Sequence, residues 1–143
     1  MNDRDRDWPS LPLEYWQDSY STLHLWTQIV GKVRLSQTPW INHSWHVPLY
    51  VSARGLTTSP IPYQHDTFQI DFDFCDHQLI ILASDGRHEQ FSLEPMSVAD
   101  FYEKTMSSLV RLGFDVSIYP KPVEVPDPIM SFDENTTLAA YDK

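Results

Sequence analysis

The sequence contains few of the residues that build phosphate-binding loops and disulfide frameworks. Its four glycines lie far apart along the chain, which argues against a P-loop or Rossmann nucleotide site. Its one cysteine, Cys75, has no second cysteine with which to form an intramolecular disulfide or a paired-cysteine zinc site. The Gly-x-Ser-x-Gly motif of a nucleophile elbow is also missing.

Long apolar runs are missing as well. No run approaches the roughly 18 residues that a transmembrane helix needs, so we expect no membrane span. Residues 1–7 alternate charges and lack the apolar core of a signal peptide, and a lone cysteine fits a reducing interior. Together these features predict a cytoplasmic protein. The formal net charge of −10 disfavours both nucleic acid and an anionic membrane surface as partners.

Acidic residues are absent from one long segment. Residues 19–65 contain no aspartate or glutamate, so all 20 acidic residues of the chain lie outside them. The segment carries three cationic residues and four histidines: Lys32, Arg34, Arg54, His24, His43, His46 and His65. This distribution predicts an acidic domain with one localised cationic face.

Hydrophobic periodicity predicts two helices and several strands. Apolar residues at helical spacing predict a helix from about residue 19 to residue 36. A capping sequence at Ser97 and Asp100 begins a second helix, and Gly113 stands where that helix ends. Alternation and turn residues predict strands at 46–54, 68–74, 79–83, 88–93 and 116–119, with a loop at 57–62. This order predicts an α+β fold: an antiparallel sheet of four to five strands with two helices packed on one face.

Proline and charge divide the chain into three parts. The total length of 143 residues suffices for a single hydrophobic core. We expect an extended N-terminal segment over 1–18, the α+β domain over 19–125, and an acidic, irregular C-terminal tail over 126–143.

The cations of the acid-free segment suggest a site for a small anionic ligand. Guanidinium groups and hydroxyls suit a phosphate or a carboxylate. The candidate ligand-binding residues are Lys32, Arg34, His43, His46, Arg54, Thr57 and Thr58. Alternatively, the cations form ordinary surface ion pairs with acidic residues such as Asp71, Asp73 and Asp76.

Metal binding is the weaker interpretation of the same region. His43 and His46 can ligate a metal or act as acid and base only if a turn brings them together, because residues three apart on a strand face opposite ways. The alternative is a packed or capping histidine pair. Asp71 and Asp73 share one strand face and could chelate a metal together. Carboxylates on the solvent-facing side of a half-buried strand are the commoner explanation of such a pair. We therefore expect no metal and no cofactor, assign no catalytic residue, and lean against an enzyme for this chain alone.

All five tryptophans lie within the first 45 residues. They are Trp8, Trp16, Trp26, Trp40 and Trp45. Such clustering is typical of a core layer between a helix and a sheet, of an interface, or of an aromatic ligand pocket. The interface interpretation gives an alternative function, a protein-interaction or self-association module with a tryptophan-rich face.

Several sequence strings together resemble an uncharacterised, mainly bacterial family of unknown function. They are W-P-S-L-P at 8–12, T-Q-I-V-G-K-V-R-L at 27–35, N-H-S-W-H-V at 42–47, R-G-L-T-T-S at 54–59, F-D-F at 72–74, S-D-G at 84–86 and S-V-A-D-F-Y at 97–102. The resemblance spans nearly the whole chain and implies no assigned activity. It also implies longer members whose related second half follows an acidic segment like Tyr141-Asp142, so this chain would correspond to an N-terminal half. A homo-oligomer or that second half would then be the partner.

Overall fold

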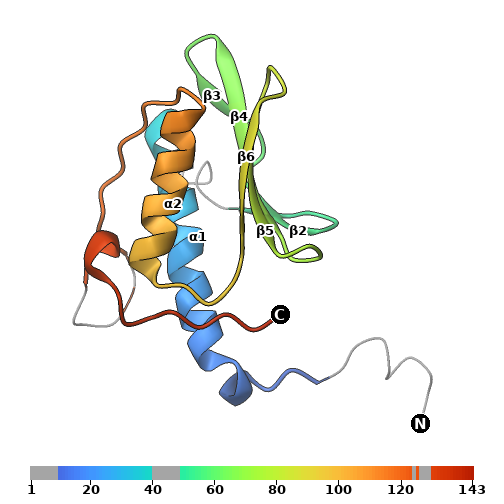
Figure 1. Cartoon of the computed structure of the whole chain (residues 1–143), viewed down its shortest axis with the longest axis vertical. Helices are drawn as coiled ribbons and strands as arrows, with labels where there is room; N and C mark the ends of the chain where they lie inside the picture. The colour runs from blue at the N-terminus through green and yellow to red at the C-terminus, as the bar shows by residue number, and fades with distance from the viewer. Residues whose placement is uncertain (1–9, 40–48, 124, 126–129) are drawn as a thin grey trace.

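The computed structural model describes residues 10–39, 49–123, 125 and 130–143, which form two layers (Figure 1). One layer is a six-stranded antiparallel sheet, and helices α1 (Gln17–Gln37) and α2 (Val98–Arg111) cover one face of it. Two 3-10 helices, η2 (Leu13–Tyr15) and η4 (Phe132–Glu134), precede α1 and follow α2. The predicted α+β class is confirmed. Among the described residues, no helix is long and apolar enough to cross a membrane.

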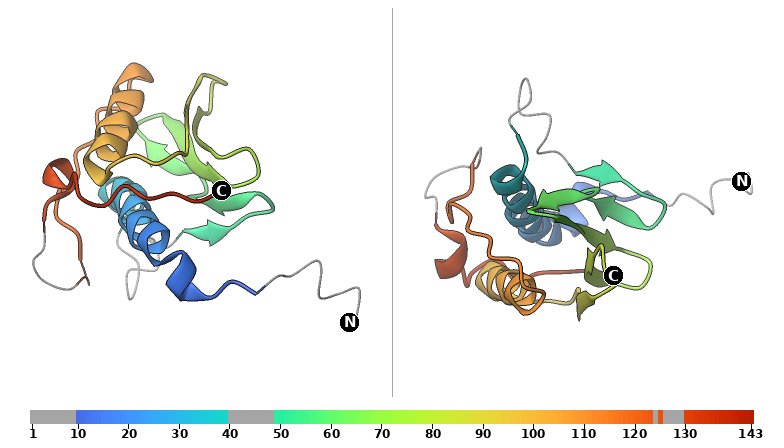
Figure 2. Two further views of the ribbon diagram at one scale, coloured as in Figure 1. Left: turned by 60° about the horizontal axis from the view of Figure 1, so that its bottom comes forward. Right: turned by 90° about the horizontal axis from the view of Figure 1, so that it is seen from above.

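The sheet is built around one long central strand. In chain order the strands are β1 (Tyr50–Val51), β2 (Gly55–Thr57), β3 (Ile61–Tyr63), β4 (Asp66–Asp73), β5 (Gln78–Ala83) and β6 (His88–Ser92). Their spatial order is β1-β2-β4-β5-β6, and β3 pairs with β4 off this path. Strands β2 and β3 share one edge of β4, at its end and its beginning respectively, while β5 takes the other edge along most of its length (Figure 2).

The first part of the sheet differs from the sequence-based prediction. Alternation predicts one strand over 46–54 and a loop over 57–62. The structure instead has a short β1, a turn, and then β2 and β3, with residues 46–48 outside the described part. The turn forms because the Ser52 hydroxyl accepts from the Gly55 N–H (3.0 Å) while the Ser52 N–H donates to the Gly55 carbonyl (2.9 Å). The alternating pattern therefore runs across a hairpin turn, which alternation alone does not detect.

The predicted last strand over 116–119 is wrong. The segment is extended and alternately buried, as a strand would be, but it pairs with no strand of the described structure. It leads instead along the helical layer, where the Gln28 side chain accepts from the Val123 N–H (2.9 Å) and donates to the Val123 carbonyl (2.7 Å). Packing every second residue on a core produces the same period of two as a hydrogen-bonded ladder.

The core lies between the helices and the inner face of the sheet. Its largest fully buried side chains are Trp26, Phe68, Phe72, Phe101, Phe132, Ile29, Ile61, Ile70, Leu79, Ile81, Leu93 and Leu109. At its centre the Phe101 ring stacks on Trp26, with centroids 4.7 Å apart, and lies parallel to Phe72 at 6.0 Å. One aromatic side chain from each helix and one from β4 thus connect the two layers.

The start and end of α2 follow the local sequence. The Ser97 hydroxyl accepts a hydrogen bond from the Asp100 N–H (3.1 Å), as the predicted cap requires. The chain turns away at Gly113, whose φ of 85° is the left-handed conformation that glycine adopts most readily. The predicted limits of this helix are therefore confirmed within one residue.

The C-terminal segment, residues 130–143, packs against the rest of the domain. The first two N–H groups of α2 donate to the carbonyls of Leu138 (3.1 Å) and Asn135 (2.9 Å), so this segment caps the helix. Phe132 is fully buried and Tyr141 is 8% exposed, and both belong to the core. Although this part of the chain has no hydrophobic period, it supplies two aromatic residues to the interior.

Candidate functional site

Arg54 is neutralised by two carboxylates. Its Nε lies 2.7 Å from Asp73 Oδ2, and its Nη2 lies 2.8 Å from Asp76 Oδ2. The hydrogen bond between the two side chains raises the pKa of Arg54 and lowers that of Asp73. Arg54 itself lines a cleft of about 340 Å³, together with Asp71 and Asp73, so acidic groups outnumber basic ones in its wall. Arg54 thus forms the ion pairs that the sequence left open as the alternative.

Lys32 and Arg34 lie on different sides of α1. Two residues apart on a helix, they project about 200° from each other. The Lys32 ammonium lies 5.4 Å from the centre of the Tyr119 ring, and burial lowers the pKa of Lys32. The Arg34 guanidinium lies 5.2 Å from the centre of the Tyr50 ring and donates to the Thr58 carbonyl. The structure therefore brings Arg34 and Thr58 together and places Lys32 apart from them.

The two candidate threonines use their hydroxyls in the loop between β2 and β3. Thr57 Oγ1 accepts from the Ser59 N–H at 3.0 Å. Thr58 Oγ1 donates to the Ser59 carbonyl at 2.7 Å and accepts from the Ile70 N–H at 3.0 Å. Because these bonds hold the positive-φ residue Ser59 against β4, both hydroxyls have a structural role.

Two candidate ligand-binding residues and one candidate metal ligand remain. His43 and His46 fall in residues 40–48, of which the structure describes nothing, so their role stays a prediction. The Asp71 carboxylate accepts both of its hydrogen bonds from the Gln69 amide, at 3.0 and 2.9 Å. Within the described ranges, no group of three metal-ligating side chains is assembled.

Two of the five tryptophans lie in the described part of the chain, and they differ in how deeply they are buried. Trp26 is fully buried between α1 and α2, which is the core-packing interpretation. Trp16, at the start of α1, is half-buried and meets Tyr20 edge-on, with ring centroids 5.5 Å apart. Trp16 also borders a cleft that no sequence motif indicated.

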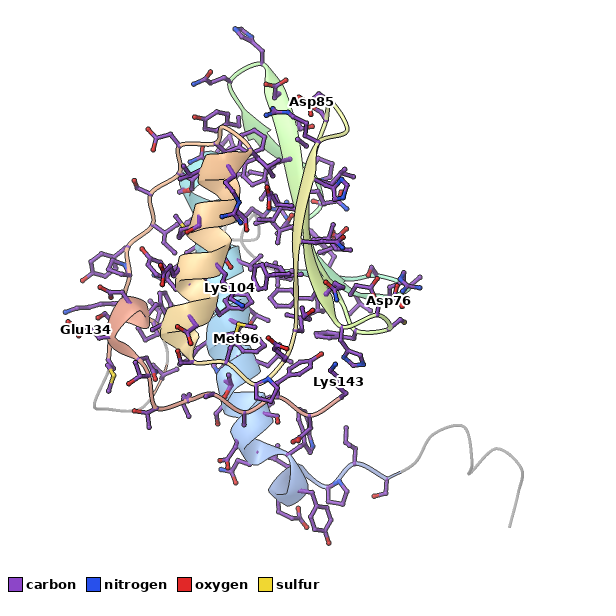
Figure 3. The ribbon with its side chains drawn as sticks, viewed as in Figure 1. Asp76, Asp85, Met96, Lys104, Glu134 and Lys143 are labelled. Atoms are coloured by element: carbon purple, nitrogen blue, oxygen red, sulfur yellow. The ribbon has the colours of Figure 1, made fainter. Side chains whose placement is uncertain are left out.

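This cleft, about 380 Å³ in volume, opens where three distant parts of the chain meet. Its lining comes from the start of α1, the turn between β4 and β5, and the chain's last residues: Leu11, Trp16, Ser19, Leu23, Phe74, His77, Tyr141, Asp142 and Lys143. Figure 3 shows Lys143 at the end of the sheet where the β4–β5 turn carries Asp76. Most of the wall is apolar, and its polar groups come from α1, the turn and the C-terminal segment.

Two hydrogen bonds organise the polar part of the cleft. His77 Nδ1 lies 2.7 Å from the Tyr141 hydroxyl, and the Ser19 hydroxyl donates to Asp142 Oδ2 at 2.7 Å. The Tyr141 ring stacks on Trp26, with centroids 5.7 Å apart, and burial raises the pKa of its phenol. Tyr141 is therefore a neutral hydrogen-bonding group at neutral pH, held by the core on one side and by His77 on the other.

The turn that presents His77 is held by its own hydrogen bonds. Asp73 Oδ1 accepts from the N–H groups of Cys75 and Asp76, both at 2.9 Å. His77 has a φ of 52°, an unfavourable conformation for a residue with a side chain, and its carbonyl accepts from the Leu93 N–H at 2.8 Å. The Arg54–Asp73–Asp76 cluster thus supports a turn whose next residue reaches into the cleft.

Sequence reasoning missed the cleft because its residues share no local pattern. Ser19, His77 and Tyr141 come from segments more than fifty residues apart, and each is unremarkable in its own neighbourhood. Tyr141-Asp142 was singled out only as part of the family resemblance. Nothing in the periodicity of the C-terminal segment indicated that its side chains meet α1.

The fold and the site define a class of protein: an α+β domain with two helices on one face of an antiparallel sheet and a mixed apolar and polar cleft where α1, the β4–β5 turn and the C-terminal segment meet. The chain belongs to a family of unknown function, DUF5996, whose model matches residues 8–143. The resemblance to an uncharacterised family is confirmed at that level. No curated protein and no solved structure matches the chain significantly.

Proposed function

We propose that this protein binds a small, largely apolar molecule that carries one hydrogen-bonding end group, in the cleft between α1, the β4–β5 turn and the C-terminal segment. The observation that carries the proposal is the combination of apolar walls and convergent polar groups in one cleft of about 380 Å³. This volume falls within the range of roughly 300–1,000 Å³ that is usual for small-molecule sites.

The apolar part of such a ligand would lie against Leu11, Trp16, Leu23 and Phe74. An indole and a phenyl ring provide large, stiff contact surfaces and favour a flat ring or a branched aliphatic group. Removing that group from water would supply most of the binding free energy.

The polar end of the ligand would face the two hydrogen-bonded pairs. The Tyr141 phenol stays neutral, and the Asp142 carboxylate takes its bond from Ser19 through one oxygen, Oδ2. The ring of His77 is turned by its Nδ1 contact with Tyr141, so its Nε2 is the nitrogen left for a ligand. A group that both donates and accepts hydrogen bonds, such as a hydroxyl or a primary amide, satisfies these partners. We assign binding to this site and no reaction.

The test is a ligand screen by thermal shift and ligand-observed NMR, using small aromatic and branched aliphatic alcohols and amides. Binding compounds are then titrated against Leu23→Trp, which fills the cleft, and against Leu13→Trp, which adds the same side chain at a half-exposed position outside it. We expect Leu23→Trp to weaken binding at least about tenfold, or 1.4 kcal/mol, and Leu13→Trp to leave it unchanged. A screen without any binder, or binders that do not distinguish the two variants, would refute the proposal.

An anion site around Arg34 is a second proposal, supported by one observation. The Arg34 guanidinium, the Tyr50 ring and the Thr58 backbone lie together, and Tyr50 follows shortly after His43 and His46 in the sequence. Titration with inorganic phosphate and small carboxylates should then raise the melting temperature of the native chain but not of Arg34→Met. Equal shifts for both proteins, or none, would remove this proposal.

We also propose a cytoplasmic setting, because Cys75 is exposed and free. An accessible thiol without a disulfide partner persists best in a reducing compartment. Fractionation of cells that express the protein should recover it, with Cys75 reduced, in the cytosol. Recovery in a membrane or secreted fraction would contradict the assignment.

A further inference from the structure

Strand β6 ends the sheet, and one of its edges has no partner strand within the described structure. In the sheet order it pairs with β5 alone, in a continuous register from Ser92↔Gln78 to His88↔Leu82. Figure 1 shows β6 at the near edge of the sheet, with α2 to one side of it. The strand contains neither proline nor lysine, and no bulge interrupts its register. Its one charged side chain, Glu89, faces the helical layer, where Arg111 neutralises it.

The hydrogen bonds at the two ends of β6 show which backbone groups face outward. The Arg87 carbonyl accepts from the Ala83 N–H at 2.8 Å, and the Leu93 N–H donates to the His77 carbonyl at 2.8 Å. The backbone groups of both flanking residues therefore point toward β5. In an antiparallel pair, those of every second residue between them, Glu89 and Phe91, do the same. The backbone N–H and carbonyl groups that point away from β5 are those of His88, Gln90 and Ser92.

We infer that β6 pairs with β6 of a second copy of this chain, antiparallel, around a two-fold axis at Gln90. In that register the outward backbone groups of His88 lie opposite those of Ser92 of the second copy, and those of Gln90 lie opposite those of Gln90 of the second copy. Each such pair exchanges both of its backbone hydrogen bonds, so every outward donor and acceptor of the edge is satisfied. The two sheets then form one continuous sheet with α2 of each copy on the same face.

The side chains of β6 are compatible with this pairing. Glu89 would stand opposite Phe91 of the second copy, so no like charges face each other across the new pair. Glu89 is already balanced by Arg111, whose Nε lies 3.3 Å from its carboxylate. The Lys104 ammonium lies 5.8 Å from the centre of the Phe91 ring, on the helix-covered face (Figure 3). The Glu89 side chains of the two copies would lie diagonally from each other, and each keeps Arg111 as its counterion, so the pairing leaves no uncompensated charge on this face.

The pairing should stop at two copies. At the other end of the sheet, β1 has two residues, too few to present a comparable edge. A two-fold contact between identical β6 edges uses the same patch on both molecules and closes upon itself. The expected assembly is therefore a dimer and not a fibre.

Sedimentation equilibrium of the full chain tests this inference, at about 0.3 M salt to screen the repulsion between two chains of net charge −10. We expect a reversible dimer for the native chain. Gln90→Pro removes the outward N–H without touching a bond to β5, and should raise the dimer dissociation constant about tenfold or more. Gln90→Thr keeps the N–H and suits a strand, so it should dimerise like the native chain. Circular dichroism checks that each variant is folded.

Hydrogen exchange identifies the face that is used. If β6 is the interface, the amides of His88, Gln90 and Ser92 exchange slowly at high protein concentration and quickly on dilution, whereas that of Phe91 is protected at both. A monomer at several hundred micromolar with fast exchange at these amides would overturn the inference. A dimer that survives in Gln90→Pro, or a monomer whose β6 is protected only by an unrelated chain, would overturn it equally.

Discussion

Replacing Tyr141 by alanine tests whether the C-terminal segment is part of the folded core. The Tyr141 side chain is 8% exposed, its ring stacks on Trp26 with centroids 5.7 Å apart, and its hydroxyl lies 2.7 Å from His77 Nδ1. Truncating a buried aromatic side chain costs about 3–5 kcal/mol of unfolding free energy. Because Tyr141 also borders an open cleft, water can fill part of the space, and we expect the lower end, about 3 kcal/mol.

A second variant separates the ring from the hydroxyl. Tyr141→Phe keeps the stacking on Trp26 and removes the hydrogen bond to His77, which should cost about 1 kcal/mol. The difference between the two variants, about 2 kcal/mol, then measures the packing of the ring. Tyr15→Ala is the matched control, because Tyr15 is 80% exposed and should change stability by less than about 0.5 kcal/mol.

The assay is urea unfolding followed by tryptophan fluorescence and by circular dichroism. Coincident transitions would show that residues 130–143 unfold together with the sheet and helices. If Tyr141→Ala costs less than about 1 kcal/mol, or no more than Tyr141→Phe, the ring does not contribute to the core and the described cleft wall is incorrect.

Three further predictions concern the elements that position the cleft. Gly55→Ala should lower the free energy of unfolding by about 1–3 kcal/mol, measured by calorimetry, because a Cβ at this position on β2 overlaps the Phe72 carbonyl oxygen on β4. An unchanged melting temperature would contradict that close approach. Ser97→Ala should cost about 1 kcal/mol of urea-unfolding free energy through loss of the α2 cap, with Ser97→Asp as the variant that restores it. The hydrogen bond from Arg54 lowers the pKa of Asp73 below its ordinary 3.8, so ionised Asp73 stabilises the fold above that pH and the contribution is lost as pH falls through the folded-state pKa. Asp73→Asn should therefore reduce the loss of stability that the native chain shows as the pH falls below 3.8. The same acid-induced loss of stability in both proteins would refute the role of the Arg54–Asp73 pair.

The parts of the fold that were predicted correctly depend on neighbours in the sequence. The cap at Ser97 and the end of α2 at Gly113 involve residues five or fewer positions apart, so their geometry follows from local chemistry. The alternation at Phe68, Ile70 and Phe72 reports one buried sheet face directly. Such signals place helices and strands before any tertiary contact is known.

The errors arose where a local pattern has two tertiary outcomes. Residues 116–119 alternate between buried and exposed as a strand does, yet the segment packs along helices and joins no ladder. Residues 46–54 alternate across a hairpin turn whose tightness depends on the Ser52 hydroxyl. Periodicity measures burial, and burial does not specify a hydrogen-bonding partner.

The candidate anion site also depends on tertiary contacts that a local pattern does not specify. A stretch without acidic residues suggests a cationic face, but the charge on a surface depends on what folds beside it. Arg54 meets Asp73 and Asp76, which lie outside that stretch, while Lys32 and Arg34 project from different sides of one helix. Charge counted along a chain therefore does not give the charge of a surface.

The sequence by itself determined the α+β class, both helices, the central strands and membership of a family of unknown function. The class, the helices and the strands follow from periodicity, caps and turns, whose interactions span a few residues. Family membership rests instead on the match of residues 8–143 to the family model. Only the tertiary structure decided that Arg54 pairs with Asp73 and Asp76, that the C-terminal segment completes the core, and that Ser19, His77 and Tyr141 share one cleft. The physical reason is that a cleft is made by contacts between segments distant in the chain, and no local preference of those segments records which others they will meet.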